Sequence, residues 1–216
     1  MFKPKEISHI ILAIVILALV VSFEVFIKKT SLGVAYFMLL LLFSAVVILV
    51  NILVKKMAAY LVDAEVEHKI WIMDRFGFYE KSYLKKPVPV GLIFPLLLSF
   101  LSLGYLKFLG MLEYDVYASK ARASKKIGNV RFSELTESHM GLIGGFAILA
   151  NIILAIVAYI LDQPLLAKIS IYYAFANILP ISNLDGTKIF FGSRVFWFLL
   201  AVISTISVLY PAIVLP

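Results

Sequence analysis

The chain has 216 residues, of which 62% are hydrophobic and only 15% are charged, and its mean hydropathy is +1.01. A charged fraction this far below the soluble norm of about 25% excludes an ordinary soluble domain and predicts an all-α, multi-pass integral membrane protein. The net charge of +7 does not imply a nucleic-acid partner, because the Lys and Arg residues lie mostly between apolar runs, where anionic lipid headgroups attract them.

Six apolar stretches approach the roughly 20 residues that a helix needs to cross a bilayer. We expect transmembrane helices at about 7–27, 32–54, 88–109, 135–161, 165–181 and 195–215. The first is longer than the apolar region of a secretory signal, so we expect a retained anchor. We assign residues 1–54 to N-terminal transmembrane helices and residues 55–216 to a membrane core. Positive charge is divided too evenly between the two sides to orient the chain.

The polar connector after the second stretch holds the densest acidic cluster, in Tyr60-Leu61-Val62-Asp63-Ala64-Glu65-Val66-Glu67-His68-Lys69-Ile70-Trp71. A helix here would place Ala64, His68 and Trp71 on one face and make Glu65 and His68 neighbours, since residues three and four apart meet on a helix. Such a Glu-x-x-His pair could share a metal ion or a proton. The alternative is an amphipathic surface helix whose acids balance the neighbouring lysines.

The fifth stretch ends in Asn177-Ile178-Leu179-Pro180-Ile181-Ser182-Asn183-Leu184-Asp185-Gly186-Thr187-Lys188. A carboxylate in lipid costs about 3 kcal/mol, so Asp185 is typical of a residue kept for a function. Pro180 interrupts helical hydrogen bonding, and irregular backbone at membrane depth is tolerated only where it lines protein or water. We expect a bent helix that presents Asp185 to an internal site. The alternative is a helix end at the membrane surface, with Asp185-Gly186 as a turn.

Together the two segments resemble the site-2 protease family of intramembrane zinc metalloproteases, over about residues 60 to 200. In that family a His-Glu-x-x-His helix supplies two zinc ligands and the catalytic Glu, and an Asn-x-x-Pro-x-x-x-Leu-Asp-Gly segment supplies the third ligand through its Asp. The second element is present here as Asn177, Pro180, Leu184, Asp185 and Gly186. Residues 144–151 are similar to the family's Gly-containing, Asn-bearing helix, without its Gly-Pro pair. The resemblance implies a site-2-protease-like core of helices.

The chain has no cysteine, so a metal would be held by His and carboxylate side chains. The resemblance implies zinc ligands at His68 and Asp185 and a catalytic base at Glu65. The chain departs from the family at Ala64, which stands where the first His would be, whereas a catalytic zinc normally has three protein ligands. The candidates for the missing ligand are Glu65 itself and His139, for which an interfacial or structural role is the alternative.

Three functions remain open. The first is a site-2-protease-like protein that is non-catalytic or catalytically impaired and binds membrane helices of a client protein. The second is an active metal-dependent intramembrane peptidase in which Glu65 or His139 replaces the missing ligand and a metal-bound water attacks the substrate. The third is a transporter of a small solute or ion, suggested by Asp185 and Lys188 on a broken helix. We expect weak or absent zinc, and we expect the bilayer and a transmembrane helix as partners.

Overall fold

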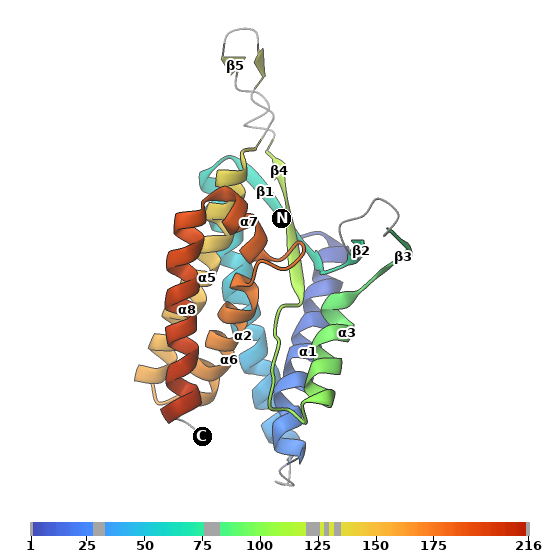
Figure 1. Ribbon diagram of the computed structural model, residues 1–216, viewed down its shortest axis with the longest axis vertical. Helices are drawn as coiled ribbons and strands as arrows, with labels where there is room; N and C mark the ends of the chain where they lie inside the picture. The colour runs from blue at the N-terminus through green and yellow to red at the C-terminus, as the bar shows by residue number, and fades with distance from the viewer. Residues whose placement is uncertain are drawn as a thin grey trace.

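The computed structural model describes residues 2–27, 33–75, 83–119, 126–127, 130–131 and 135–214. Seven helices lie in this part of the chain (Figure 1): α1 (Pro4–Ile27), α2 (Val34–Leu61), α3 (Val90–Leu101), α5 (Glu137–Ile160), α6 (Pro164–Ile178), α7 (Asp185–Gly192) and α8 (Arg194–Val214). The fold is therefore mostly helical, as the composition predicts.

Three of these helices are long and apolar enough to cross a membrane, namely α1, α2 and α5, with candidate spans at Pro4–Phe23, Val34–Leu61 and Glu137–Ile160. Helices α3 and α8 provide shorter apolar segments. Each of the six predicted stretches contains a helix. Six complete crossings remain a prediction, because length and composition support three.

The all-α prediction is incomplete, because six short strands pair into three antiparallel two-stranded sheets. Strand β1 (Ala64–Ile70) pairs with β4 (Leu112–Ala118), β2 (Met73–Arg75) with β3 (Tyr83–Val88), and β5 (Lys126–Ile127) with β6 (Val130–Arg131). In Figure 1, β1 and β4 lie side by side near the end of the helical bundle that also carries α7.

The predicted helix over residues 60–71 is wrong for most of its length. Helix α2 ends at Leu61, and β1 begins at Ala64. Along β1 the side chains alternate between buried positions, including Ala64 and His68, and more exposed ones, including Glu65. Successive strand residues point to opposite faces, so this period of two fits a half-buried strand. Glu65 and His68 consequently face away from each other rather than forming a helical pair.

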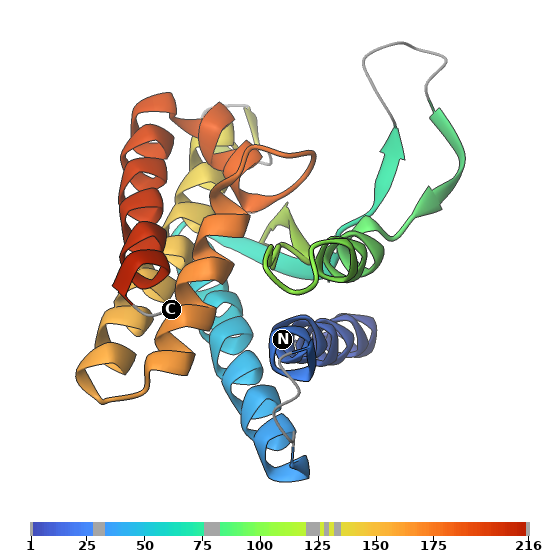
Figure 2. The same ribbon diagram turned by 60° about the horizontal axis from the view of Figure 1, so that its bottom comes forward.

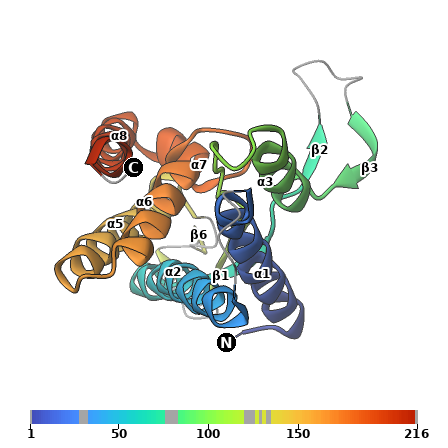
Figure 3. The same cartoon turned by 90° about the horizontal axis from the view of Figure 1, so that it is seen from below.

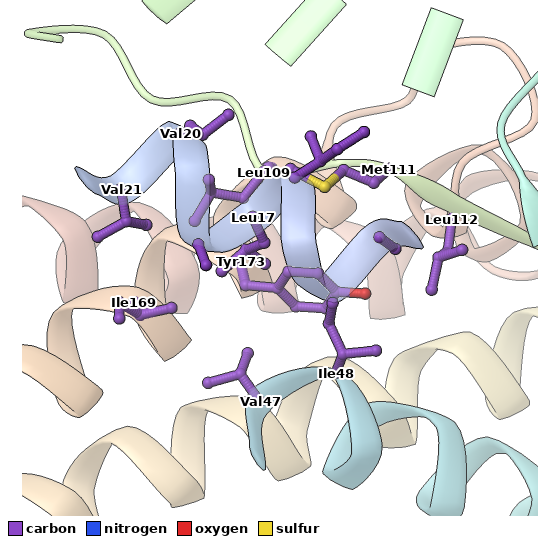
Figure 4. Close-up of a cluster of buried hydrophobic side chains, with 14 of the residues drawn as sticks. Leu17, Val20, Val21, Val47, Ile48, Leu109, Met111, Leu112, Ile169 and Tyr173 are labelled. Atoms are coloured by element: carbon purple, nitrogen blue, oxygen red, sulfur yellow. The ribbon is translucent and has the colours of Figure 1, made fainter. Parts of the chain in front are cut away.

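The main hydrophobic cluster joins α1, α2, α6 and the segment leading into β4. Figure 4 shows α1 side chains such as Leu17 packed against Ile48 of α2, Tyr173 of α6, and Leu109. Helix α2 runs without a break through the predicted domain boundary between residues 54 and 55. Figures 2 and 3 show α2 between α1 on one side and the group of α5, α6 and α8 on the other. Residues of α2 can therefore meet residues from the C-terminal half.

Candidate functional site

The segment between α6 and α7 turns back on itself and buries Asp185. Helix α6 ends at Ile178, before Pro180, and Ser182 takes a left-handed conformation with φ of 50°. Asp185 is the first residue of α7 and is 0% exposed. The prediction that a helix breaks near Pro180 and presents Asp185 to the protein interior is confirmed.

A close backbone approach explains the glycine that follows Asp185. A Cβ atom at Gly186 would lie 2.1 Å from the carbonyl oxygen of Ile178, a distance that no side chain can occupy. The indole Nε1 of Trp197, on α8, donates a hydrogen bond to the same carbonyl at 2.9 Å. The end of α6 is thus held between α7 and α8, which fixes the direction in which Asp185 enters the core.

Asp185 forms a buried ion pair with Lys55 of α2. The Lys55 Nζ atom lies 2.6 Å from Asp185 Oδ2, and the two side chains are 1% and 0% exposed. In a low-dielectric interior an uncompensated charge is very costly, so each partner is needed to neutralise the other. The pair therefore joins α2 to α7 in the protein interior and forms a first polar centre.

A tyrosine and a second lysine complete this centre. Tyr114 of β4 is fully buried, with the Nζ atoms of Lys55 and Lys188 at 4.6 and 3.8 Å from its ring centroid. Lys188 also donates a hydrogen bond to the Tyr114 carbonyl oxygen, and the Tyr114 hydroxyl donates to the carbonyl of Met140 at 2.7 Å. Burial lowers the pKa of Lys188 to about 8, although the nearby Asp185 carboxylate acts in the opposite direction.

Unpartnered amide groups occupy the helices that pack around this centre. Asn51 stands one helical turn before Lys55 on α2, on the same face, and Asn151 lies on α5; both are fully buried. Among the residues that the structure describes, neither amide side chain has a hydrogen-bond partner, and neither does Asp185 Oδ1. Buried polar groups are nearly always hydrogen-bonded, so such a set is typical of a functional site or of one that holds water.

His68 belongs to a second polar centre, with Glu6 and Lys56. The His68 Nδ1 lies 2.9 Å from Glu6 Oε1, and the His68 backbone N–H donates to the same oxygen at 3.2 Å. Lys56 Nζ lies 2.8 Å from Glu6 Oε1, and Glu6 is 1% exposed. The two predicted ligands therefore contact different partners, since His68 meets Glu6 and Asp185 meets Lys55.

Burial sets the protonation state of His68. It lowers the pKa of the imidazole to about 4, the hydrogen bond with Glu6 opposes this shift, and the charge of Lys55 adds to it. His68 is consequently neutral at pH 7. Lys55 and Lys56, which belong to the first and the second polar centre, are adjacent residues of α2.

Among the described residues, the other two predicted site residues make no hydrogen bond or ion pair with His68 or Asp185. Glu65 is exposed on the outer face of β1, opposite to the face that carries His68. His139 lies in the first turn of α5, where its backbone N–H and its ring both contact Thr136, the N-cap residue. Within the described ranges no three His, Asp or Glu residues gather closely enough to hold a metal ion. The structure does not bring His68, Asp185 and either of these residues into one ligand group.

Sequence reasoning missed Lys55 and Asn51. The prediction placed Lys55 at the start of a polar connector, where a lysine serves as an interfacial anchor. A signal was nevertheless available, because Asn51 and Lys55 are four residues apart at the end of an apolar run longer than a bilayer requires.

A cavity of about 170 Å³ lies next to the Asp185 centre, lined by residues of α5, of α7 and of the turn before it: Glu137, Met140, Ser182, Asn183, Thr187, Lys188 and Phe191. The arrangement as a whole offers two ammonium groups, one carboxylate and several amides, which can bind and orient polar groups.

Comparisons of the chain with models of protein families, with curated proteins and with solved structures found no match in any of the three.

Proposed function

We propose that the chain is a multi-pass integral membrane protein that resembles site-2 proteases, does not use a metal at Asp185, and binds membrane helices of client proteins. The observation that carries this proposal is the buried ion pair between Lys55 and Asp185. The resemblance would place a metal ion beside this carboxylate, whereas in this chain the ammonium group of Lys55 lies beside it.

The helix that faces Asp185 is α2, and this changes how the resemblance maps onto the chain. A His-Glu-x-x-His motif ending at Lys55 would start at Asn51 and place its catalytic Glu at Ile52. An ammonium group has three donors and no lone pair, so Lys55 cannot coordinate zinc, and its charge repels a divalent cation. Ile52 cannot act as a base. All three functional positions of the motif are therefore altered, whereas the Asp-Gly element is retained.

Binding of membrane helices is supported by the surface and by the cavity beside Asp185. Helices α2, α5 and α8 expose large apolar side chains, among them Leu42, Ile153 and Phe198, which are 58%, 58% and 60% exposed. Exposed apolar surface of this kind is typical of contact with lipid or with another protein. The hydroxyl of Thr187 and the ammonium of Lys188 line the cavity, where they could satisfy backbone groups of a helix that unwinds locally.

The first experiment tests the absence of a working metal site. Wild-type protein in detergent should carry no stoichiometric zinc. The triple variant Asn51→His, Ile52→Glu and Lys55→His should bind one zinc ion per chain, because the two introduced histidines and Asp185 then provide three ligands. The matched control is the same triple variant with Asp185→Asn, which should lose the ion. Stoichiometric zinc in the wild type that disappears in Asp185→Ala and His68→Ala would contradict this proposal and favour the metal-dependent peptidase.

The second experiment tests helix binding. The probe is a synthetic apolar helix of about 22 residues, long enough to cross a bilayer, with a fluorophore at one end and a central Pro that allows local unwinding. We expect energy transfer from the tryptophans of the protein to the fluorophore of the bound helix in nanodiscs. Thr187→Phe, which fills the cavity beside Asp185, should reduce this transfer. The control variant Thr205→Phe, at an exposed position on α8, should leave the transfer unchanged. Equal transfer for all three proteins would contradict a specific helix site.

A further inference from the structure

A second cavity, of about 230 Å³, opens where α1 begins and α2 ends. Lys3 precedes α1, Lys56 and Tyr60 lie in the last turns of α2, and Glu65 and Tyr117 come from β1 and β4. It lies at the boundary of two candidate spans, which is where the headgroups of a bilayer would be.

The floor of this cavity is an internal ion pair, and its rim is open. Lys56 is held by Glu6, which is 1% exposed. At the rim, Lys3 pairs with Glu67 at 2.5 Å while its side chain remains 63% exposed. Two lysines and three glutamates line the cavity, so one negative charge is left over. Among the described residues Glu65 makes no ion pair, and it is the exposed carboxylate of this set.

Two aromatic side chains line the same cavity as the unpaired carboxylate. Tyr117 is directly opposite Glu65 in the antiparallel pair of β1 and β4, so both side chains emerge on the same face of the sheet. Tyr60 is 81% exposed at the mouth of the cavity. A carboxylate next to aromatic rings recognises an organic ammonium ion, through charge and through cation–π attraction. The lysines of the same cavity can meet a phosphate that is linked to that ammonium.

An exposed apolar face of α2 leads away from the cavity. Positions 42, 49, 53, 56 and 60 fall on one side of the helix, and the first three are leucines that are 58%, 41% and 49% exposed. Lys56 and Tyr60, which line the cavity, continue this face. A ligand with a charged head and apolar tails could therefore place both parts on adjacent surfaces.

We propose that this cavity binds the phosphoethanolamine headgroup of a membrane phospholipid, with the acyl chains along the leucine face of α2. The ammonium takes the place of the Lys3 Nζ atom, which lies 5.8 Å from the centroid of the Tyr117 ring, and it sits beside the Glu65 carboxylate. The phosphodiester is directed to Lys3, displaced in this way, and to Lys56. The site requires that the chain lies in a bilayer, but it does not depend on how Asp185 functions or on any client protein.

The test uses the full chain, purified from mixed vesicles of phosphatidylethanolamine and phosphatidylglycerol, with retained lipids counted by native mass spectrometry. Phosphatidylglycerol carries the same phosphate and tails without the ammonium. We expect retention of phosphatidylethanolamine to be about tenfold higher, which the ion pair and the cation–π contact can supply together. Glu65→Gln and Tyr117→Leu should each bring the two lipids to near parity. Asp74→Asn, an exposed acid on β2 outside the cavity, should leave the preference unchanged.

Other outcomes would overturn the proposal. Equal retention of the two lipids by the wild type, or an unchanged preference in Glu65→Gln, would exclude an ammonium site. Soluble glycerophosphoethanolamine should displace the bound lipid only weakly, since it lacks the acyl chains that lie on α2. Displacement at a concentration equal to that of the lipid would show that the cavity binds a free headgroup compound rather than a membrane lipid.

Discussion

Removal of the Lys55 charge should destabilise the protein more than the loss of its packing can explain. At a separation of 2.6 Å and an effective dielectric constant of about 20, the attraction between the two charges is about 6 kcal/mol. Part of this gain offsets the desolvation of both groups, so breaking a buried pair from one side costs about 3–5 kcal/mol. Lys55→Met keeps most of the side-chain volume but leaves Asp185 buried without its partner. We expect the free energy of unfolding to fall by about 3 kcal/mol, at the lower end of this range, because the charge of Lys188 can partly neutralise that of Asp185.

The double variant Lys55→Met, Asp185→Asn provides the decisive comparison. It removes both charges, and replacing a buried ion pair by groups of similar volume is often neutral or stabilising. Its free energy of unfolding should therefore lie within about 1 kcal/mol of the wild type. Unfolding can be followed in mixed micelles by the fluorescence of Trp197, whose indole contacts the end of α6. The exposed lysine variant Lys86→Met serves as the control and should be neutral. If Lys55→Met alone costs less than about 0.5 kcal/mol, the ion pair does not stabilise the fold and the reasoning is refuted.

Two more perturbations test local features. Gly186→Ala should lower the free energy of unfolding by about 3 kcal/mol and displace α7, because its Cβ would lie 2.1 Å from the backbone oxygen of Ile178. The matched control in thermal unfolding is Gly33→Ala, where a Cβ meets nothing within 4 Å. It should cost less than about 1 kcal/mol, which allows for the weaker capping of α2 by alanine. Lowering the pH from 7 to 5 should destabilise the protein by about 2 kcal/mol, because the pKa of His68 is lowered to about 4 and the unfolded chain, with the ordinary value of 6.5, binds the proton first. The contribution of His68 to stability is complete above pH 6.5 and is lost as the pH falls toward 4. The dependence of the free energy of unfolding on pH in this range should disappear in His68→Gln. An equal pH dependence in that variant would assign the effect to another group.

The helices could be predicted because a long apolar run is a property of neighbouring residues. The burial of Asp185 was predictable for a similar reason, since the cost of a carboxylate in lipid and the proline break are both local. Strand β1 was missed because one histidine and one glutamate at a spacing of three were given more weight than the alternation of Ala64, Val66 and His68 with charged residues. That alternation was present in the sequence, and a period of two should have been tested first.

The pairing of Lys55 with Asp185 could not be predicted from local sequence patterns. The two residues come from α2 and α7, and the contact depends on how those helices pack, which no local pattern specifies. A lysine that follows an apolar run is usually an interfacial anchor, so its burial goes against the ordinary rule. The partner of Asp185 was therefore sought in the connector that follows, although the histidine chosen there contacts Glu6 instead.

The ion pair between α2 and α7 also has a consequence for biogenesis. Lys55 is synthesised long before Asp185, so during translation its ammonium group has no carboxylate to neutralise it. Lys55 lies close to the end of α2 at Leu61, near enough for a flexible lysine to reach the aqueous interface. When α7 docks, the same side chain is withdrawn into the interior. The C-terminal end of α2 is thus expected to lie closer to the aqueous interface in a nascent chain than in the finished protein. A chain truncated before α7 should retain a water-accessible lysine at position 55.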